Sequence, residues 1–456
     1  MMRIQMPQLL KSMAATTFFA AGSLLAQEAP APPMGLQLSN GPFNQTGYYQ
    51  AEAGAACATC ASDTACEACA SCEDECEEEE SPFSFTGWLD AGITWNGRNP
   101  VDRFNGPTTF NDRDGELMMN QFYLLAQRTI EADGCNWDFG FRIDAVFGTD
   151  SRFTKATGLE WDRGFNEKWN SNNRRFYQFA LPQFYVEAAL PIGNGLTVKA
   201  GHFYTLIGYE VVTAPDGFFY SHAYTHQYGE PFTHTGVLLS YPWGENLSVT
   251  AGVTRGWDNF DDNNSSLAFL GSATLTFNEE KTSLTYALHT GPEQNLNNAN
   301  NRFMQSIVLN HQISDSLTYI FESDLGIDEN LVAPGVDAQW YGINQYLLYT
   351  MSEEWAFGVR AEWFRDDAGV RVVSLNNTAG QPVGTHYATL PGIPGGVGTH
   401  FFEVTVGANW SPAENLKIRP EVRFDWSNAS GGSVNPYNFG ANGSQVLAGF
   451  DVIYSF

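Results

Sequence analysis

Clustered cysteines are the residues of this chain with the most evident potential for chemistry. Six of the seven cysteines fall within residues 57–76, and the last four have the spacing of a bacterial iron–sulfur run. Glu77, however, stands where that run has a proline. In an exported chain, disulfides within or between subunits are the favoured interpretation, and a zinc or soft-metal site comes second. The six residues are Cys57, Cys60, Cys66, Cys69, Cys72 and Cys76.

The same cysteines would form a stripe along one face if their Ala/Glu-rich segment were helical. Three such helices could then be cross-linked beneath a trimer. Cys135, in a turn expected on the same side of the membrane, would join that network. Non-reducing electrophoresis that shows only monomer would exclude this hypothesis.

Histidines offer a second candidate for metal chemistry. His222 and His226 are spaced i, i+4, with His202 and His234 nearby in the sequence. This spacing favours a shared metal only on a helix, and proline and glycine surround the pair. Ordinary loop histidines are therefore the favoured interpretation, and no metal is assigned.

Charged residues form the largest candidate set. They fall on the polar phase of alternating runs, where side chains would face a water-filled lumen and select solutes by size and charge. Pairing that merely braces the wall is the alternative for any one of them. The set comprises Asp90, Arg142, Asp144, Glu187, Lys199, Glu322, Asp324, Arg360, Glu362, Glu403, Arg419, Glu421, Arg423 and Asp425.

A constriction is expected from the third long loop, near residues 209–233, which is rich in aromatic residues and proline. Inward folding would narrow the channel and add negative charge, whereas an outward loop would pack on its neighbours. The constriction candidates are Glu210, Asp216, Phe218, Phe219, Tyr220 and Glu230.

Catalytic motifs are absent from the sequence. It contains no G-x-S-x-G, no H-E-x-x-H and no phosphate-binding glycine loop. We therefore expect neither an enzyme nor a cofactor. The net charge of -28 also argues against a nucleic-acid partner.

Strands must position these residues, because period-two alternation runs from Phe83 to the last residue. In one run, Ile418, Val422 and Phe424 alternate with charged residues. The runs are about as long as tilted membrane strands and longer than typical soluble strands. Because no internal apolar run could form a helical span, a closed antiparallel barrel of about sixteen strands (14–18) is predicted.

Connections between the runs alternate between long and short along the chain. Short joins include PIGNG (191–195), PWGEN (242–246) and NEEK (278–281), whereas segments such as 150–180, 327–337 and 366–399 are long. Tight periplasmic turns and long external loops are typical of outer-membrane barrels. A soluble β-sandwich has no reason to sort its connections in this way.

Three segments resemble a known family, the OmpL-like beta-barrel porin-2 group. They are NQFYLLAQ (120–127) followed by Arg128, FGFRIDAVFGTD (139–150), and 195–236, which includes GLTVKAGHFYTLIGYE, GFFYSH and EPFTHTG. The resemblance extends over nearly all of 83–456. It implies a porin-like channel but no particular substrate, and it does not include the cysteine-rich segment.

The sequence therefore predicts three parts. Residues 1–26 have the positive flank and apolar core of a secretory signal. Residues 27–82 form a Cys/Glu-rich periplasmic linker, mostly disordered or locally helical. Residues 83–456 form the barrel, and its final strand, ending in Phe456, has the features read by the barrel-insertion machinery despite Asp451 at a position where a small residue is common.

The expected function is passive diffusion of small hydrophilic solutes or ions across the outer-membrane lipid. Residues 81–456 contain 40 acidic and 21 basic residues, which suggests a weak cation preference. The alternative is a structural or adhesive envelope protein, a plugged barrel anchored through its linker. A homotrimer is expected for a porin of this size.

Overall fold

The computed structural model describes residues 81–132, 134–162, 166–170, 176–372, 398–429, 435–438 and 440–456. The predicted signal segment and all but the last two residues of the predicted linker lie outside this part of the chain. So do six of the seven cysteines. Their predicted pairing or metal binding, and the helix hypothesis, therefore stay predictions.

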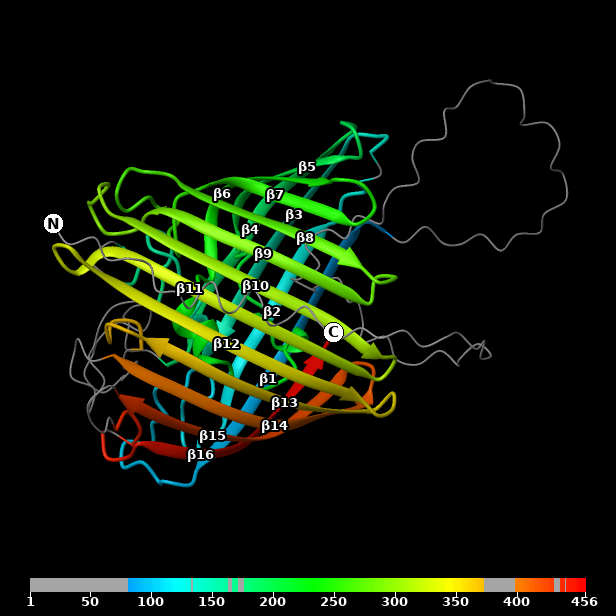
Figure 1. Cartoon of the computed structure of the whole chain (residues 1–456). Coiled ribbons are helices and arrows are strands. Elements are labelled where there is room, and N and C mark those ends of the chain that lie inside the picture. Colours follow the sequence, from blue (N-terminus) through cyan, green and yellow to red (C-terminus); the bar gives the residue numbers. More distant parts are fainter. Residues whose placement is uncertain are drawn as a thin grey trace, which may run out of the picture. The chain divides into compact units, whose positions relative to one another are not determined.

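Sixteen antiparallel strands close into one barrel, which confirms the predicted fold (Figure 1). Each strand pairs with its neighbour in sequence, and the last pairs with the first. Closure leaves no strand edge unpaired, as a lipid environment demands. The strands are β1 (Phe83–Asn96), β2 (Met118–Arg128), β3 (Asp138–Gly148), β4 (Gln178–Leu190), β5 (Leu196–Tyr204), β6 (Thr233–Pro242), β7 (Leu247–Thr254), β8 (Ala268–Phe277), β9 (Thr282–Pro292), β10 (Asn301–Ser314), β11 (Leu317–Ala333), β12 (Val336–Thr350), β13 (Trp355–Asp366), β14 (Thr399–Ala413), β15 (Leu416–Ala429) and β16 (Ser444–Ser455).

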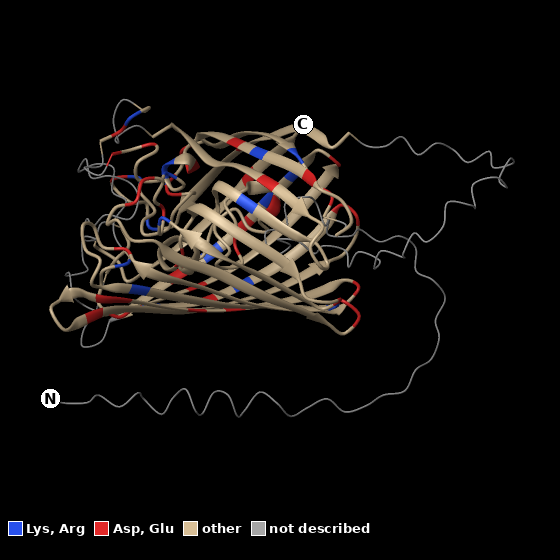
Figure 2. Cartoon of the chain, turned by 90° about the horizontal axis from the view of Figure 1, so that it is seen from above, with Lys and Arg blue, Asp and Glu red and all other residues tan. Residues whose placement is uncertain are grey.

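Alternation along the strands divides apolar residues from charged ones. On β15, Val422 and Phe424 are 53% and 43% exposed on the outer surface, whereas Arg423 and Asp425, which alternate with them, are fully buried. Acidic and basic positions recur along the strands as well as in the loops (Figure 2). The outer face thus suits lipid, and the charged residues face the interior.

The prediction of a long loop at 327–337 is wrong. Both strands continue through it, so that β11 ends at Ala333, β12 begins at Val336, and Ala333 pairs with Val336. Gly335, with φ of 79°, supplies a left-handed conformation that a tight turn uses readily. The polar residues at this end of β11 belong to an extended hairpin rather than to a loop.

The third long connection, residues 205–232 between β5 and β6, is called L3 below. L3 contains a short 3-10 turn, η3 (Ala214–Asp216), and one turn of π-helix, η4 (Thr225–Gly229). A further 3-10 turn, η2 (Asp150–Arg152), follows β3. None of the helices in the described residues is long and apolar enough to cross a bilayer. L3 lies inside the barrel, where it contacts strands distant in sequence.

Candidate channel constriction

All fourteen charged residues predicted to face the lumen lie on the inward face of their strands. Thirteen are buried, and Glu187 is half-buried. Most contact L3 or one another. Many of these residues therefore pair with other groups and brace the wall, which was the alternative to lining an open lumen.

Carboxylates of the wall accept hydrogen bonds from the backbone of L3. The donors are the N–H groups of Tyr220 and Ser221 to Glu421, those of Tyr224 and Thr225 to Glu362, and that of Tyr209 to Glu322. These five bonds span 2.6 to 3.1 Å between nitrogen and oxygen. Peptide N–H groups enclosed in the barrel need acceptors, so these three side chains fix the loop at three places.

Cationic side chains bind the carbonyl groups of the same loop. Arg360 donates to the Ser221 oxygen at 2.7 Å, and Arg419 donates to the Ala214 and Gly217 oxygens at 2.8 and 2.7 Å. Lys417 and Arg423 make similar bonds to Pro215 and His222. The wall therefore satisfies both polarities of a backbone that is enclosed in the barrel, as buried peptide groups require.

Asp451 of the terminal strand, which stands where a small residue is common, has a partner inside the barrel. Its carboxylate accepts hydrogen bonds from Arg419 Nε at 3.0 and 3.1 Å, inside the barrel. An acidic residue at this position thus holds one of the guanidiniums that bind L3. Asp451 and Lys417 share the inward phase of the fourteen predicted residues, and this phase was the signal that could have added them to the set.

Two glycines let aromatic rings of L3 approach the wall closely. A Cβ atom on Gly358 would lie 2.3 Å from Phe218 Cε1, and one on Gly92 would lie 2.5 Å from Tyr220 Cζ. Glycine in a strand commonly marks such a close approach. Sequence reasoning missed both residues, because glycine carries no polar phase to follow.

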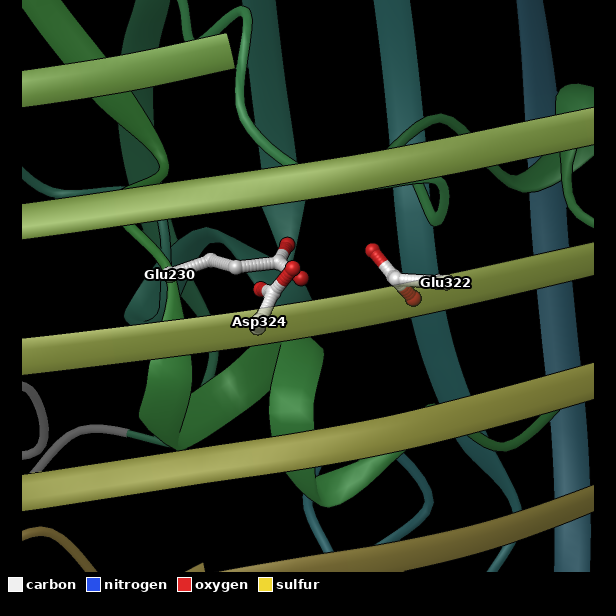
Figure 3. Close-up of side chains that lie close together, drawn as sticks. All are labelled: Glu230, Glu322 and Asp324. Atoms are coloured by element: carbon white, nitrogen blue, oxygen red, sulfur yellow. The ribbon is translucent and has the colours of Figure 1, made fainter. Parts of the chain in front are cut away.

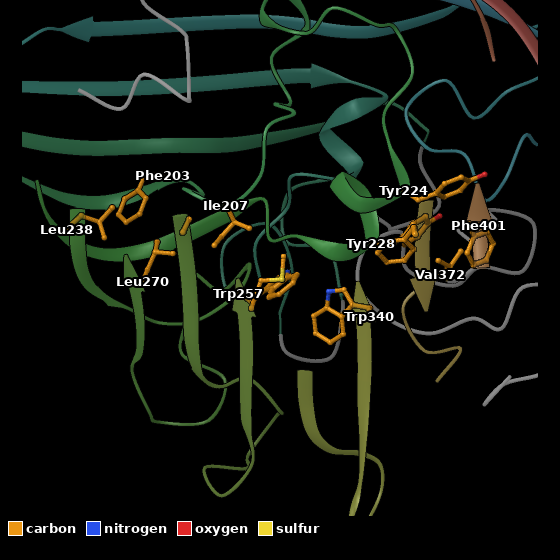
Figure 4. Packing of buried hydrophobic residues seen from close by; sticks show 13 residues of the cluster. Phe203, Ile207, Tyr224, Tyr228, Leu238, Trp257, Leu270, Trp340, Val372 and Phe401 are labelled. Atoms are coloured by element: carbon orange, nitrogen blue, oxygen red, sulfur yellow. The ribbon is translucent and has the colours of Figure 1, made fainter. Parts of the chain in front are cut away.

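An apolar cluster holds the ends of L3 (Figure 4). Ile207 and Tyr228 pack among the buried Trp257 and Trp340, whose rings lie 6.0 Å apart edge to face. Trp340 Nε1 also donates to the Gly229 oxygen at 2.9 Å. These contacts and the charged groups together give L3 one position.

His222 and His226 lie together, but His202 belongs to a separate part of the interior. His222 lies 3.0 Å from Glu210 and stacks on His226 at 4.8 Å between ring centroids. His202, by contrast, hydrogen-bonds Thr235. Burial lowers the pKa of His226 to about 3, so its ring is neutral. The turn at 225–229 is π-helical and does not place His222 and His226 on a regular α-helix.

On the opposite part of the interior, hydroxyl groups of the described strands β6 to β9 take the place of the arginine–carboxylate pairs seen on β13 to β16. Ser240 bonds Thr250 at 2.8 Å, and Thr274 bonds Thr285 at 3.0 Å, across neighbouring strands β6 to β9. Ser240, Thr274 and Thr285 are half-buried, as is Ser272 beside them. We call these five residues the hydroxyl wall.

The two halves of L3 differ in exposure. Tyr209, Glu210 and Phe218 in the first half are half-buried, and Asp216 is exposed. Nearly all of 219–232 is buried, with Phe219, Tyr220 and Glu230 enclosed. The six predicted constriction residues thus divide between a solvent-contacting part and an enclosed part of the loop.

Charge on L3 depends on its surroundings. Burial acts to raise the pKa of the Glu210 carboxyl, but Arg360 and His222 together hold it well below the ordinary value. Asp216 is exposed, but the nearby wall displaces part of the water around its carboxyl group, and this desolvation raises its pKa to about 6. Glu210 is therefore ionised at neutral pH, and Asp216 changes charge just below it.

We expect the cation preference of the channel to increase between about pH 5 and pH 7, because Asp216 ionises in that interval. Asp216→Asn should flatten this change. Asp315→Asn, in an exposed turn, is the control and should keep it. Reversal potentials measured at several pH values test the prediction, and an unchanged pH profile in Asp216→Asn would contradict it.

The same ionisation affects stability with a defined sign. The folded-state pKa of Asp216 lies above the ordinary value, so the protonated carboxyl favours the folded state. Its contribution to the free energy of unfolding is full at low pH and is lost as the pH rises through about 6.

Comparisons with known proteins agree with the barrel fold. Residues 82–456 match the family model "Putative beta-barrel porin-2, OmpL-like". An anion-selective porin from Comamonas acidovorans is similar at a TM-score of 0.52 with 9% identity, over 82% of this chain and 99% of that one. OprB of Pseudomonas putida is similar at 0.51 with 11% identity, over 82% and 94%.

Identities this low show the shared fold alone. A comparison with curated protein sequences gives no match. The family match covers the whole described barrel and confirms the resemblance noted in the sequence. The chain belongs to the OmpL-like beta-barrel porin-2 family and is a porin channel of the bacterial outer membrane.

Proposed function

We propose that the barrel passes small hydrophilic solutes and ions by diffusion, along the hydroxyl wall and the first half of L3. The observation that carries this route is the difference in exposure. Four of the five residues of the hydroxyl wall, and residues 208–210 and 215–218 of L3, keep solvent contact inside the barrel, whereas nearly all of 219–232 is enclosed against the charged strands. Hydroxyl groups replace water around a passing solute without holding it by charge.

A weak cation preference is part of the proposal. Acidic residues outnumber basic ones by 40 to 21 within residues 81–456, and nine of the fourteen predicted lining residues are acidic. Much of the interior charge is paired, however, so the preference should be small. The Comamonas porin is anion-selective, and that selectivity is a property of that protein.

Single-channel recording of the refolded protein in a planar bilayer tests the proposal. Stepwise openings are expected, with a reversal potential of the sign for cations under a salt gradient. Silence from a correctly folded barrel would contradict it. That result would favour the alternative, a plugged structural or adhesive protein, for which the enclosed half of L3 is the supporting observation.

We expect Glu187→Gln and Lys199→Gln to shift selectivity in opposite directions. These two residues pair across β4 and β5 at 3.9 Å between Lys199 Nζ and Glu187 Oε1, a weak contact near the hydroxyl wall. Loss of the acid should lower the cation-to-anion permeability ratio, and loss of the base should raise it. Equal shifts in the same direction would place the pair away from the route.

Three further parts of the proposal concern assembly and chemistry. We infer that the channel catalyses no reaction, in line with the family. We also infer that it forms a homotrimer, which native mass spectrometry would detect. Cys135, in the turn between β2 and β3, is disulfide-bonded. We propose that the linker cysteines are also oxidised, which reduction followed by a mobility shift on gels would reveal.

A further inference from the structure

Three carboxylates meet inside the barrel where the end of L3 reaches the wall. Glu230 directly follows η4, and Glu322 and Asp324 lie two residues apart on the inward face of β11. One oxygen of each lies within 4.8 Å of the others. Figure 3 shows the Glu230 side chain reaching toward Asp324, with Glu322 on the same strand. All three residues are at most 2% exposed.

The negative charge of this group has no cationic side chain to balance it within the described part of the chain. Among the described ion pairs, none joins these carboxylates to a lysine or arginine. Both oxygens of Glu230 also lack a hydrogen-bond donor among the described residues, and Asp324 has the Ser306 hydroxyl nearby but outside regular hydrogen-bond geometry. Three enclosed carboxylates in this state are costly unless a cation or protons reduce their charge.

Neutral polar groups around the carboxylates are also unpartnered within the residues that the structure describes. His226, 5% exposed, has no hydrogen bond at either ring nitrogen, and its Nδ1 lies 3.6 Å from Glu230 Oε2. Asn344 Oδ1 is buried without a partner as well. Register places Asn344 opposite Glu322 and Ser306 opposite Asp324. Several buried polar atoms that could contact a ligand therefore surround the acidic group.

We propose that Glu230, Glu322 and Asp324 bind one divalent cation of the calcium type, which fastens the end of L3 to β11. Oxygen ligands select hard cations. An ion held at about 2.3–2.6 Å from each oxygen accepts ligands up to about 5 Å apart, which suits calcium better than the shorter distances of magnesium. The amide oxygen of Asn344 is of the same ligand class.

Other bonds to the cluster are compatible with this site. Glu322 accepts hydrogen bonds from the Tyr209 N–H at 2.8 Å and from Asn344 Nδ2 at 2.7 Å, and these bonds orient it without using all its lone pairs. The ion thus links both ends of L3, because Tyr209 lies near the start of the loop and Glu230 near its end. One cation would close the loop against a single strand.

Calcium binding to the full-length chain in detergent tests the proposal directly. After removal of metal with EGTA, titration calorimetry with calcium chloride should show one site per chain. Glu230→Gln combined with Asp324→Asn should weaken binding by at least about 100-fold, since even changes to groups that only orient the ligands cost about 10–100-fold. Asp328→Asn, on the inward face of the same strand but paired with Arg302 at 2.5 Å, is the matched control and should bind normally.

Folding of each variant is checked by the heat-dependent gel mobility of the barrel. Binding that is unchanged in the folded double variant would assign the ion to another place and overturn the proposal. No binding by the folded native chain would also overturn it, and the carboxyls would then share protons. Preference for magnesium over calcium would overturn the assignment of the ion.

A channel measurement adds the consequence for L3 and rests on the proposed function. EGTA should increase the current fluctuations of the native protein and leave those of the double variant unchanged. The calorimetry does not depend on conduction. A silent barrel that binds calcium would therefore refute the diffusion proposal and keep the metal site.

Discussion

Excision of 209–231 from L3, with a short Gly/Ser bridge in its place, is expected to raise single-channel conductance several-fold. L3 occupies the interior between the hydroxyl wall and the charged strands, and sixteen-stranded barrels without such filling leave a wide aqueous channel. The charged residues that bind the loop would then face water. Their pairs with one another, such as Arg423 with Asp425 at 2.8 Å, would remain.

A matched control shortens a connection that does not enter the barrel. The hairpin tip between β11 and β12, at 331–336, is mostly exposed and can be shortened without contact with L3. This variant should conduct like the native protein. If excision of 209–231 leaves conductance unchanged, L3 does not limit the current, and the constriction lies elsewhere.

Replacement of Arg360 by methionine is expected to destabilise the barrel by about 3–5 kcal/mol, the usual cost of leaving buried partners of an ion pair uncompensated. The guanidinium binds Glu403 at 2.5 Å and Glu210 at 2.7 Å, and it also donates to the Ser221 oxygen. Its removal leaves two carboxylates close together and frees a bend of L3. Lower unfolding temperatures and additional subconductance levels should appear together.

Two comparisons make the Arg360 experiment specific. Arg255→Met removes an exposed arginine whose side chain donates to the Phe260 oxygen, and it should change neither property. Adding Glu403→Gln to Arg360→Met should recover part of the lost stability, because one unpaired charge disappears. Native stability in Arg360→Met alone would show that the guanidinium does not hold the loop.

The sequence alone determined the barrel. Period-two alternation is local, so strands could be located from their own residues. The predicted short joins 191–195 and 278–281 are the connections between β4 and β5 and between β8 and β9. The inward phase of residues such as Arg423 and Asp425 followed from the same pattern. The prediction of a loop at 327–337 was wrong. Asp328, Asn330 and Pro334 are residue types common in loops, but pairing with β12 extends β11 through them.

Only the tertiary structure decided what the inward charges do. Ser221 and Glu421 are 200 positions apart, and Tyr209 and Glu322 are 113 apart, so no local pattern relates them. The course of L3 depends on the sum of such distant contacts, and the group of Glu230, Glu322 and Asp324 exists only because that course returns the loop to β11. Periodicity tells which face a side chain takes, but closure of the barrel and the path of the loop determine which side chains meet.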